Sequence, residues 1–125
     1  MEREAFEQLV AEAIESLPAV LKRRIENVSV EVMPIAPAEI ADGLGRHPWS
    51  LLGVYRGVPF NRRGTWYGNV LPDRILIFQK PIERLCQNAE QVKSLVRRVV
   101  IHEVGHYFGL SEAELSRLES ARSEQ

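Results

Sequence analysis

The first segment of the chain has the apolar spacing of a helix. Its apolar positions form one stripe: Phe6, Leu9, Val10, Ala13, Ile14 and Leu17. This spacing predicts an amphipathic helix with one buried face. Pro18 predicts a break, and the stretch PAVLKRRIEN that begins there predicts a second, short helix.

Three later segments have the pattern of strands. In NVSVEVMP, Val28, Val30 and Val32 alternate with polar residues and Pro34 ends the run, which predicts a half-buried strand. LLGVYRG predicts a second strand, and RILIFQK, short and apolar on both faces, predicts a third. IAPAEIADGLGRHPWS, rich in proline and glycine and without clear periodicity, predicts a loop.

The longest helical pattern runs from Gln87 or Asn88 to Phe108. Its apolar positions are Val92, Leu95, Val96, Val99, Val100 and Val104. Many of them are β-branched, so packing must supply most of the helix's stability. A last short helix, EAELSRLES, and a polar tail at about residues 120–125 follow, and no linker or repeat divides residues 1–125, which we expect to form a single domain.

Composition narrows the class of protein. The chain is 125 residues long, 45% hydrophobic and 26% charged, as in ordinary globular domains with one core. A net charge of −1 creates no overall field for nucleic acid or an acidic membrane, and no apolar run is long enough to span a bilayer. The single Cys86 excludes an intrachain disulfide and a zinc site built mainly from thiolates. The acidic, amphipathic N-terminus is unlike a signal peptide, so we expect a cytoplasmic protein.

The motif HEVGH lies near the end of the long predicted helix. His102 and His106 are four residues apart, on one helical face, so both imidazoles can reach an ion about 2 Å away. Glu103 is turned by roughly 100° round the helix, where its carboxylate can act as a base on a metal-bound water. Two structural histidines are the alternative. The apolar SLVRRVVI before the motif favours metal binding, because a polar pair on a buried helix is costly without a partner.

A catalytic zinc usually has three protein ligands and one open position. Gly109 can end the helix in a left-handed conformation and turn the chain back towards the ion. Glu112 is then the favoured third ligand, with Glu114, His47 or a water as alternatives. Ser111 and Glu114 also have the spacing of a capping box, which is compatible with Glu112 as a ligand.

The segment HEVGHYFGLSE resembles the extended H-E-x-x-H-x-x-G-x-x-(H/D) signature of metzincin zinc peptidases. LLGVYRGVPFNRRG and LPDRILIFQKPI are similar to segments of small bacterial zincin-like metallopeptidases with a minimal metzincin fold. The resemblance covers most of residues 5–117. It implies an α+β fold in which a small mixed β-sheet packs on the active-site helix.

The same resemblance implies one Zn²⁺ per chain, with His102, His106 and Glu112 as ligands and Glu103 as general base. It also implies that the strand near Ile75–Phe78 is an edge strand able to pair with an extended peptide.

The chain departs from the metzincin pattern in two respects. Met1 and Met33 both lie upstream of the motif, so no methionine follows the third ligand to form the turn beneath the metal. Glu112 stands where metzincins have histidine or aspartate, and its extra methylene changes its reach.

Other side chains are candidates for stabilising an oxyanion besides the ion. They are Tyr55, Tyr67, His47 and Arg74, and nothing in the sequence ranks them. RGVPFNRRGTWYG interleaves arginines with aromatic residues; without a nucleic-acid-binding motif, we expect this loop to fold over the cleft and shape substrate access.

These features predict a zinc-dependent peptidase that acts on a peptide or protein substrate in extended conformation. The alternative is a catalytically silent metal-binding protein that holds an extended partner segment in its groove. Glu103 favours the enzyme, because a silent site has no evident use for that carboxylate. A protease specific for one cellular protein would also be inert towards generic substrates.

Overall fold

The computed structural model describes residues 1–25, 27–57, 73–111 and 113–117. The elements follow in the order α1 (Arg3–Glu15), α2 (Ala19–Arg24), β1 (Ser29–Met33), α3 (Ala38–Gly43), the 3-10 turn η1 (Pro48–Ser50), β2 (Gly53–Arg56), β3 (Arg74–Phe78), α4 (Gln79–Arg84) and α5 (Ala89–Phe108). Residues 113–117 form a further helical segment. The three predicted strands are therefore confirmed, as are the two N-terminal helices and the long helix.

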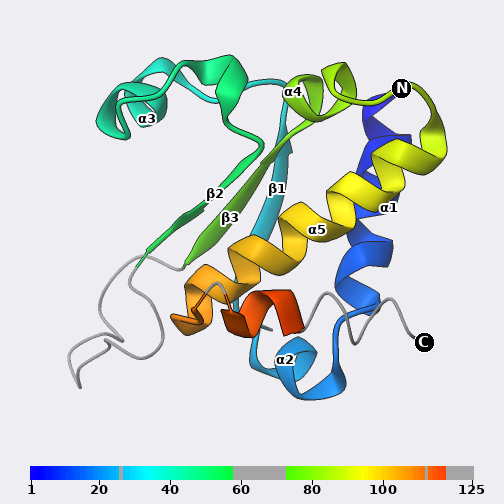
Figure 1. Ribbon diagram of the computed structural model, residues 1–125, viewed down its shortest axis with the longest axis vertical. Coiled ribbons are helices and arrows are strands. Elements are labelled where there is room, and N and C mark those ends of the chain that lie inside the picture. Colours follow the sequence, from blue (N-terminus) through cyan, green and yellow to red (C-terminus); the bar gives the residue numbers. More distant parts are fainter. Residues whose placement is uncertain (26, 58–72, 112, 118–125) are drawn as a thin grey trace.

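The strands form one mixed sheet with the order β1-β3-β2. β1 pairs with β3 in parallel and β2 pairs with β3 antiparallel. Figure 1 shows α5 crossing one face of this sheet with α1 beside it. The expected α+β architecture, a small mixed sheet packed on one long helix, is confirmed.

The expectation that Ile75–Phe78 forms an edge strand is wrong. β3 lies between β1 and β2, and its four apolar residues are at most 1% exposed. Ile75 and Ile77 join the core beneath α1 and α5, whereas Leu76 and Phe78 pack with Leu51 on the opposite face. An apolar run without alternation is what burial on both faces requires, so the pattern of this segment is that of a central strand.

The long helix α5 has a defined cap at each end. The side chain of Asn88 accepts a hydrogen bond from the backbone N–H of Gln91 at 2.9 Å. Gly109 follows the last turn with φ 70°, the left-handed conformation that its sequence position predicts, and Leu110 N–H donates to Gly105 C=O at 2.9 Å. The helix ends at this turn, immediately after the histidine motif.

The segment predicted as a loop before Leu51 contains regular structure. It holds α3 and η1, with Pro37 immediately before α3 and Pro48 as the first residue of η1. Proline is favoured at a helix start, because the missing N–H has no helical partner there. Pro81 similarly lies in the first turn of α4, a helix that the sequence pattern does not predict.

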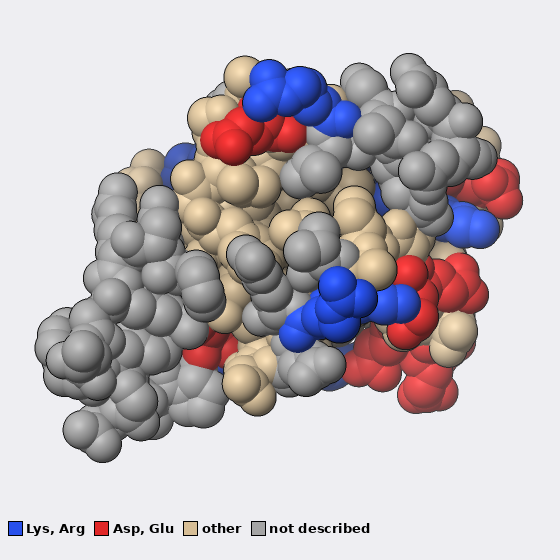
Figure 2. All heavy atoms as spheres, turned by 90° about the horizontal axis from the view of Figure 1, so that it is seen from below, with Lys and Arg blue, Asp and Glu red and all other residues tan. Residues whose placement is uncertain are grey.

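Most of RGVPFNRRGTWYG, including Tyr67, lies outside the described residues. Within the described ranges no helix is long and apolar enough to cross a membrane. On the face seen in Figure 2, basic and acidic side chains lie beside one another, which agrees with the balanced net charge.

Candidate metal centre

The last turns of α5 bring His102, Glu103 and His106 together. One ligand atom from each lies within 4.8 Å of those of the other two. The two imidazole rings meet edge to face, with centroids 4.5 Å apart. His102 is partly buried and His106 is half exposed, so the pair lies where the helix meets solvent.

Glu103 is the buried member of this cluster, at 6% exposure. Its Oε1 lies 3.2 Å from Nδ1 of His106 and has no hydrogen-bond partner among the described residues. Burial raises the pKa of Glu103 to about 7, although the nearby His102 and a hydrogen bond from the backbone N–H of Tyr55 act in the opposite direction. A cation at the histidines would lower that pKa.

The donor set fits a divalent metal. Two imidazoles and a carboxylate are ligand types that zinc accepts and that other divalent metals also share. A buried carboxylate oxygen without a hydrogen bond costs free energy, and a bound cation or its water would relieve that cost. The three residues therefore have both the chemistry and the proximity of a metal site.

Two of the alternatives for the third ligand do not join the cluster. Glu114 Oε1 accepts from Ser111 N–H at 3.0 Å, while Ser111 Oγ accepts from Glu114 N–H at 3.1 Å, so the predicted capping box is confirmed. His47 is exposed, and its Nδ1 accepts from Trp49 N–H at 3.2 Å. Glu112, the favoured candidate, lies outside the described residues, and its role as a ligand stays a prediction.

Strand β2 lies against α5 at the level of Glu103. Leu52 C=O accepts from Phe78 N–H of β3, whereas Tyr55 N–H donates to the Glu103 carboxylate. The main-chain N–H and C=O groups of successive strand residues point to opposite sides of the strand. Those of Gly53 and Tyr55 therefore point away from β3.

Gly53 permits this close packing. A Cβ at this position would lie 2.9 Å from Val99 Cγ1, 3.1 Å from Leu76 C=O and 3.4 Å from Glu103 Cγ. Sequence reasoning did not select Gly53. A glycine inside a predicted strand is nevertheless a recognised signal of close backbone approach.

A hollow of about 390 Å³ opens beside the cluster. It is lined by Arg46, Ser50, Leu51, Leu52, Gly53, Arg98, Val99, His102 and Glu103. Sequence reasoning identified only the last two of these residues. Arg98 could have been found, because it precedes His102 by one helical turn, but the residues from 46 to 53 reach the site only through the tertiary fold.

The family model of zincin-like metallopeptidases matches residues 25–122. The chain belongs to the zincin-like metallopeptidase family. The solved structure of a conserved hypothetical protein from Thermo thermophilus is similar to this zincin-like protein, with a TM-score of 0.58 and 24% identity over 93% of this chain and 99% of that one. At this identity the similarity concerns the fold alone. A comparison with curated proteins gives no match.

The structure gives other partners to the described oxyanion candidates of this zincin-like protein. The Tyr55 hydroxyl donates to Asp73 Oδ1 at 3.0 Å. Arg74 donates two 2.9 Å hydrogen bonds to Glu31, and these, together with one from Ser29 Oγ, lower the pKa of that carboxyl to about 2. His47 accepts the hydrogen bond from Trp49, and Tyr67 is not described.

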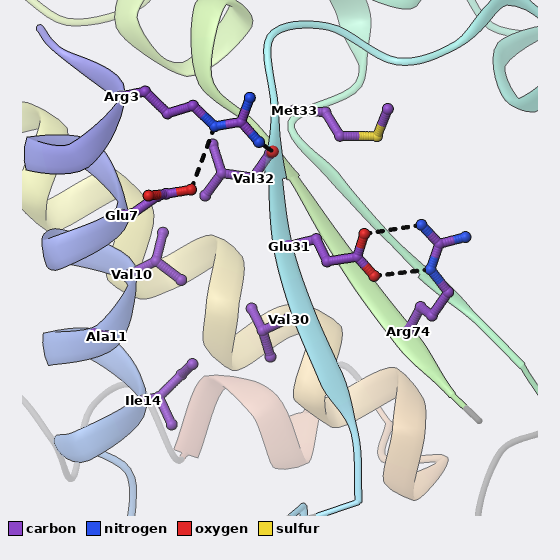
Figure 3. Close-up of a pocket in the computed structure, with 10 residues that line it drawn as sticks. All are labelled: Arg3, Glu7, Val10, Ala11, Ile14, Val30, Glu31, Val32, Met33 and Arg74. Atoms are coloured by element: carbon purple, nitrogen blue, oxygen red, sulfur yellow. Dashed lines mark hydrogen bonds and ion pairs between the residues drawn. The ribbon is translucent and has the colours of Figure 1, made fainter.

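The Arg74–Glu31 pair lines a different hollow, between α1 and β1. Figure 3 shows Val30 and Val32 pointing towards α1 and Glu31 pointing towards Arg74. This hollow, about 500 Å³, is larger than the one beside the histidines but shares no lining residue with it. Size alone therefore does not identify the site in this fold.

Proposed function

We propose that this zincin-like protein is a zinc-dependent peptidase in which Glu103 is the general base. One observation carries the proposal. A buried carboxylate lies beside two imidazoles at the wall of an open hollow, and its Oε1 has no hydrogen-bond partner among the described residues. Such a group is costly to the fold, which favours a chemical role over a structural one.

His102 and His106 would hold the zinc, with Glu112 as the predicted third ligand. When bound, the ion polarises a carbonyl and makes water a stronger nucleophile near neutral pH. Both histidines lie in the last two turns of α5, a helix capped at both ends and packed on the sheet. Rigid support of this kind limits the reorganisation needed on metal binding.

Glu103 moves the proton. Its carboxylate accepts a proton from the attacking water and then donates it to the nitrogen of the leaving amine. The hydrogen bond from Tyr55 N–H orients the carboxylate, and burial by Gly53, Val99 and the helix itself keeps the side chain from rotating into solvent.

An extended peptide or protein segment is the proposed substrate. β2, not β3, is the strand whose outward main-chain groups face the cluster, and it is an edge strand within the described residues. A substrate that added to this edge would gain main-chain hydrogen bonds at Gly53, next to Glu103. The packing of β2 against α5 supports this alignment.

The test combines metal analysis with hydrolysis. Protein purified without an affinity tag or chelator is analysed for metal by mass spectrometry, and zinc-loaded protein is incubated with a mixed peptide library whose products are identified by mass spectrometry. We expect Glu103→Gln to retain zinc and to lose hydrolysis by a factor of about 10² to 10⁴. Glu114→Gln, an exposed capping residue, is the matched control and should cleave as wild type does.

The outcomes separate the two functions considered. If Glu103→Gln cleaved peptides as fast as wild type, Glu103 would not be the base. If wild type bound one zinc but cleaved no peptide, the protein would instead be the silent metal-binding protein. If wild type took up no zinc, the peptidase proposal would fail.

A further inference from the structure

Two arginines lie in the wall of the hollow beside the histidine cluster. Arg46 comes from the turn after α3, and Arg98 comes from α5. Both are exposed, whereas Glu103, the acidic residue of the described lining, is buried. The part of the wall that a ligand meets first is therefore positively charged.

Arg46 is held in a defined position. Its Nε donates to Ser50 Oγ at 3.1 Å and its Nη2 donates to Ser50 C=O at 2.8 Å. Ser50 Oγ in turn donates to His47 C=O at 2.7 Å, so the turn η1 fixes the guanidinium. A guanidinium has five N–H donors, and these two bonds leave others for a ligand.

Arg98 precedes His102 by four residues on α5. It therefore lies on the same helical face, about 6 Å along the axis. No hydrogen bond or ion pair engages its guanidinium within the ranges that the structure describes. Two arginines that line one hollow, and that have no carboxylate partner among the described residues, are suited to a carboxylate of a ligand.

We propose that this hollow accepts a carboxylate of the substrate, held by Arg98 and Arg46, and so makes the protein selective for acidic peptides. The inference rests on the proposed peptidase function, because it assigns the hollow to the substrate of the His102–His106 site. The carboxylate belongs either to an Asp or Glu side chain near the scissile bond or to the free C-terminus of the peptide. Leu52 and Val99 of the same wall contact the aliphatic part of that residue.

Peptide binding is measured separately from hydrolysis. Fluorescence anisotropy is recorded with labelled peptides of one length, in which a scanned position is Glu, Gln or Lys and both ends are blocked. A second set has a neutral sequence with a free or an amidated C-terminus. The protein is zinc-loaded Glu103→Gln, which is expected not to turn over, and metal-free wild type is measured beside it.

We expect one acidic set to bind about five to ten times more tightly than its neutral counterpart. A preference for Glu over Gln identifies a side chain as the source, and a preference for the free over the amidated end identifies the C-terminus. The preference should weaken as salt is raised, because exposed charges are screened. Arg98→Gln should abolish it and Arg98→Lys should retain part of it.

Arg23→Gln is the matched control, since it removes one exposed positive charge from α2 and leaves the hollow intact. Equal binding of acidic and neutral peptides would overturn the inference. So would an equal loss of binding for all peptides in Arg98→Gln. Cleavage by wild type without regard to peptide charge would leave the peptidase function standing and remove its acidic selectivity. Selective binding of acidic peptides that are never cleaved would support the carboxylate site and contradict the peptidase function.

Discussion

The side chain of Leu115 occupies the space that a Cβ on Gly105 would need, so a methyl group at Gly105 would overlap it. Gly105 lies inside the histidine motif, and Leu115, 2% exposed, belongs to the helical segment that follows the turn at Gly109. The missing side chain thus lets the chain fold back onto α5 beside His106. The residues between the turn and Leu115 include the predicted third ligand, so the glycine supports the site without contacting it.

Gly105→Ala is therefore expected to destabilise the protein. Overpacking a buried contact costs about 1–3 kcal/mol, whereas alanine gains at most about 1 kcal/mol over glycine in helix propensity. Urea unfolding of metal-free protein measures the difference. Gly43→Ala is the control: it is the last residue of α3, no atom lies within 4 Å of its added Cβ, and the change should be neutral or slightly stabilising. A Gly105→Ala variant as stable as wild type would show that Leu115 moves aside at no cost.

Zinc should raise the unfolding midpoint of wild type. A ligand that binds only the folded state adds about 4 kcal/mol at a thousandfold excess over its Kd. His106→Ala should abolish this increase, because one of the two imidazoles is lost. Thermal unfolding with and without zinc measures it, and a chelator should reverse it.

The two glutamates beyond Gly109 should respond differently in the same assay. Glu112→Ala is expected to reduce the zinc-induced increase if Glu112 is the third ligand. Glu114→Ala should instead lower stability by about 1 kcal/mol with and without zinc alike, because it removes the hydrogen bond that Glu114 accepts from Ser111 N–H in the capping box. If the zinc-induced increase were reduced in Glu114→Ala but unchanged in Glu112→Ala, Glu114 and not Glu112 would be the third ligand.

The sequence predicts features that depend on neighbouring residues better than features that depend on distant ones. α5 begins after Asn88 and ends before Gly109, as the sequence predicts. Ser111 and Glu114 form the predicted capping box. These features are predictable because each cap acts within one turn of helix. Which strand lies at the edge depends on pairing across more than forty residues between β1 and β3. Local alternation cannot encode that pairing, although the continuous apolar run of β3 indicates a central strand.

The residues of the candidate site also divide into those that the local sequence predicts and those that only the tertiary fold brings together. His102, Glu103 and His106 share one helix, so their spacing alone predicts their proximity. Arg46 and Gly53 reach them only because η1 and β2 fold against α5. The prolines in that region begin α3 and η1, while the glycine and proline content of the segment predicts a loop. Composition does not distinguish a proline that starts a helix from one in a turn.

Metal-free wild type should lose stability as pH rises, relative to Glu103→Gln. Burial raises the pKa of Glu103 from 4.5 to about 7, so between these values the folded protein binds more protons than the unfolded chain. The stability that this pKa difference contributes to the folded state is complete below pH 4.5 and is lost as pH rises through 7. A shift of this size corresponds to about 3 kcal/mol.

Unfolding free energies measured across this pH range test the effect. Glutamine is neutral throughout, and the two proteins share every other side chain, so the difference between wild type and Glu103→Gln isolates Glu103. A difference that does not vary with pH would mean that Glu103 ionises as an exposed carboxyl does.

Gly53→Ala should reduce catalysis more than stability. Its Cβ would lie 2.9 Å from Val99 Cγ1 and 3.1 Å from the rigid Leu76 C=O, so β2 and α5 must move apart by a few tenths of an ångström. That movement lengthens the hydrogen bond from Tyr55 N–H to Glu103 and displaces the carboxylate from its position beside His106. General-base catalysis is sensitive to such displacement, because proton transfer needs donor and acceptor within about 3 Å. We expect kcat to fall about tenfold or more with zinc content unchanged, since the histidines lie on the same helix and move together.

Val54→Ala, one residue along the strand and turned towards the opposite face, is the control and should retain kcat. A Gly53→Ala enzyme with normal kcat would show that Glu103 does not depend on β2 for its orientation.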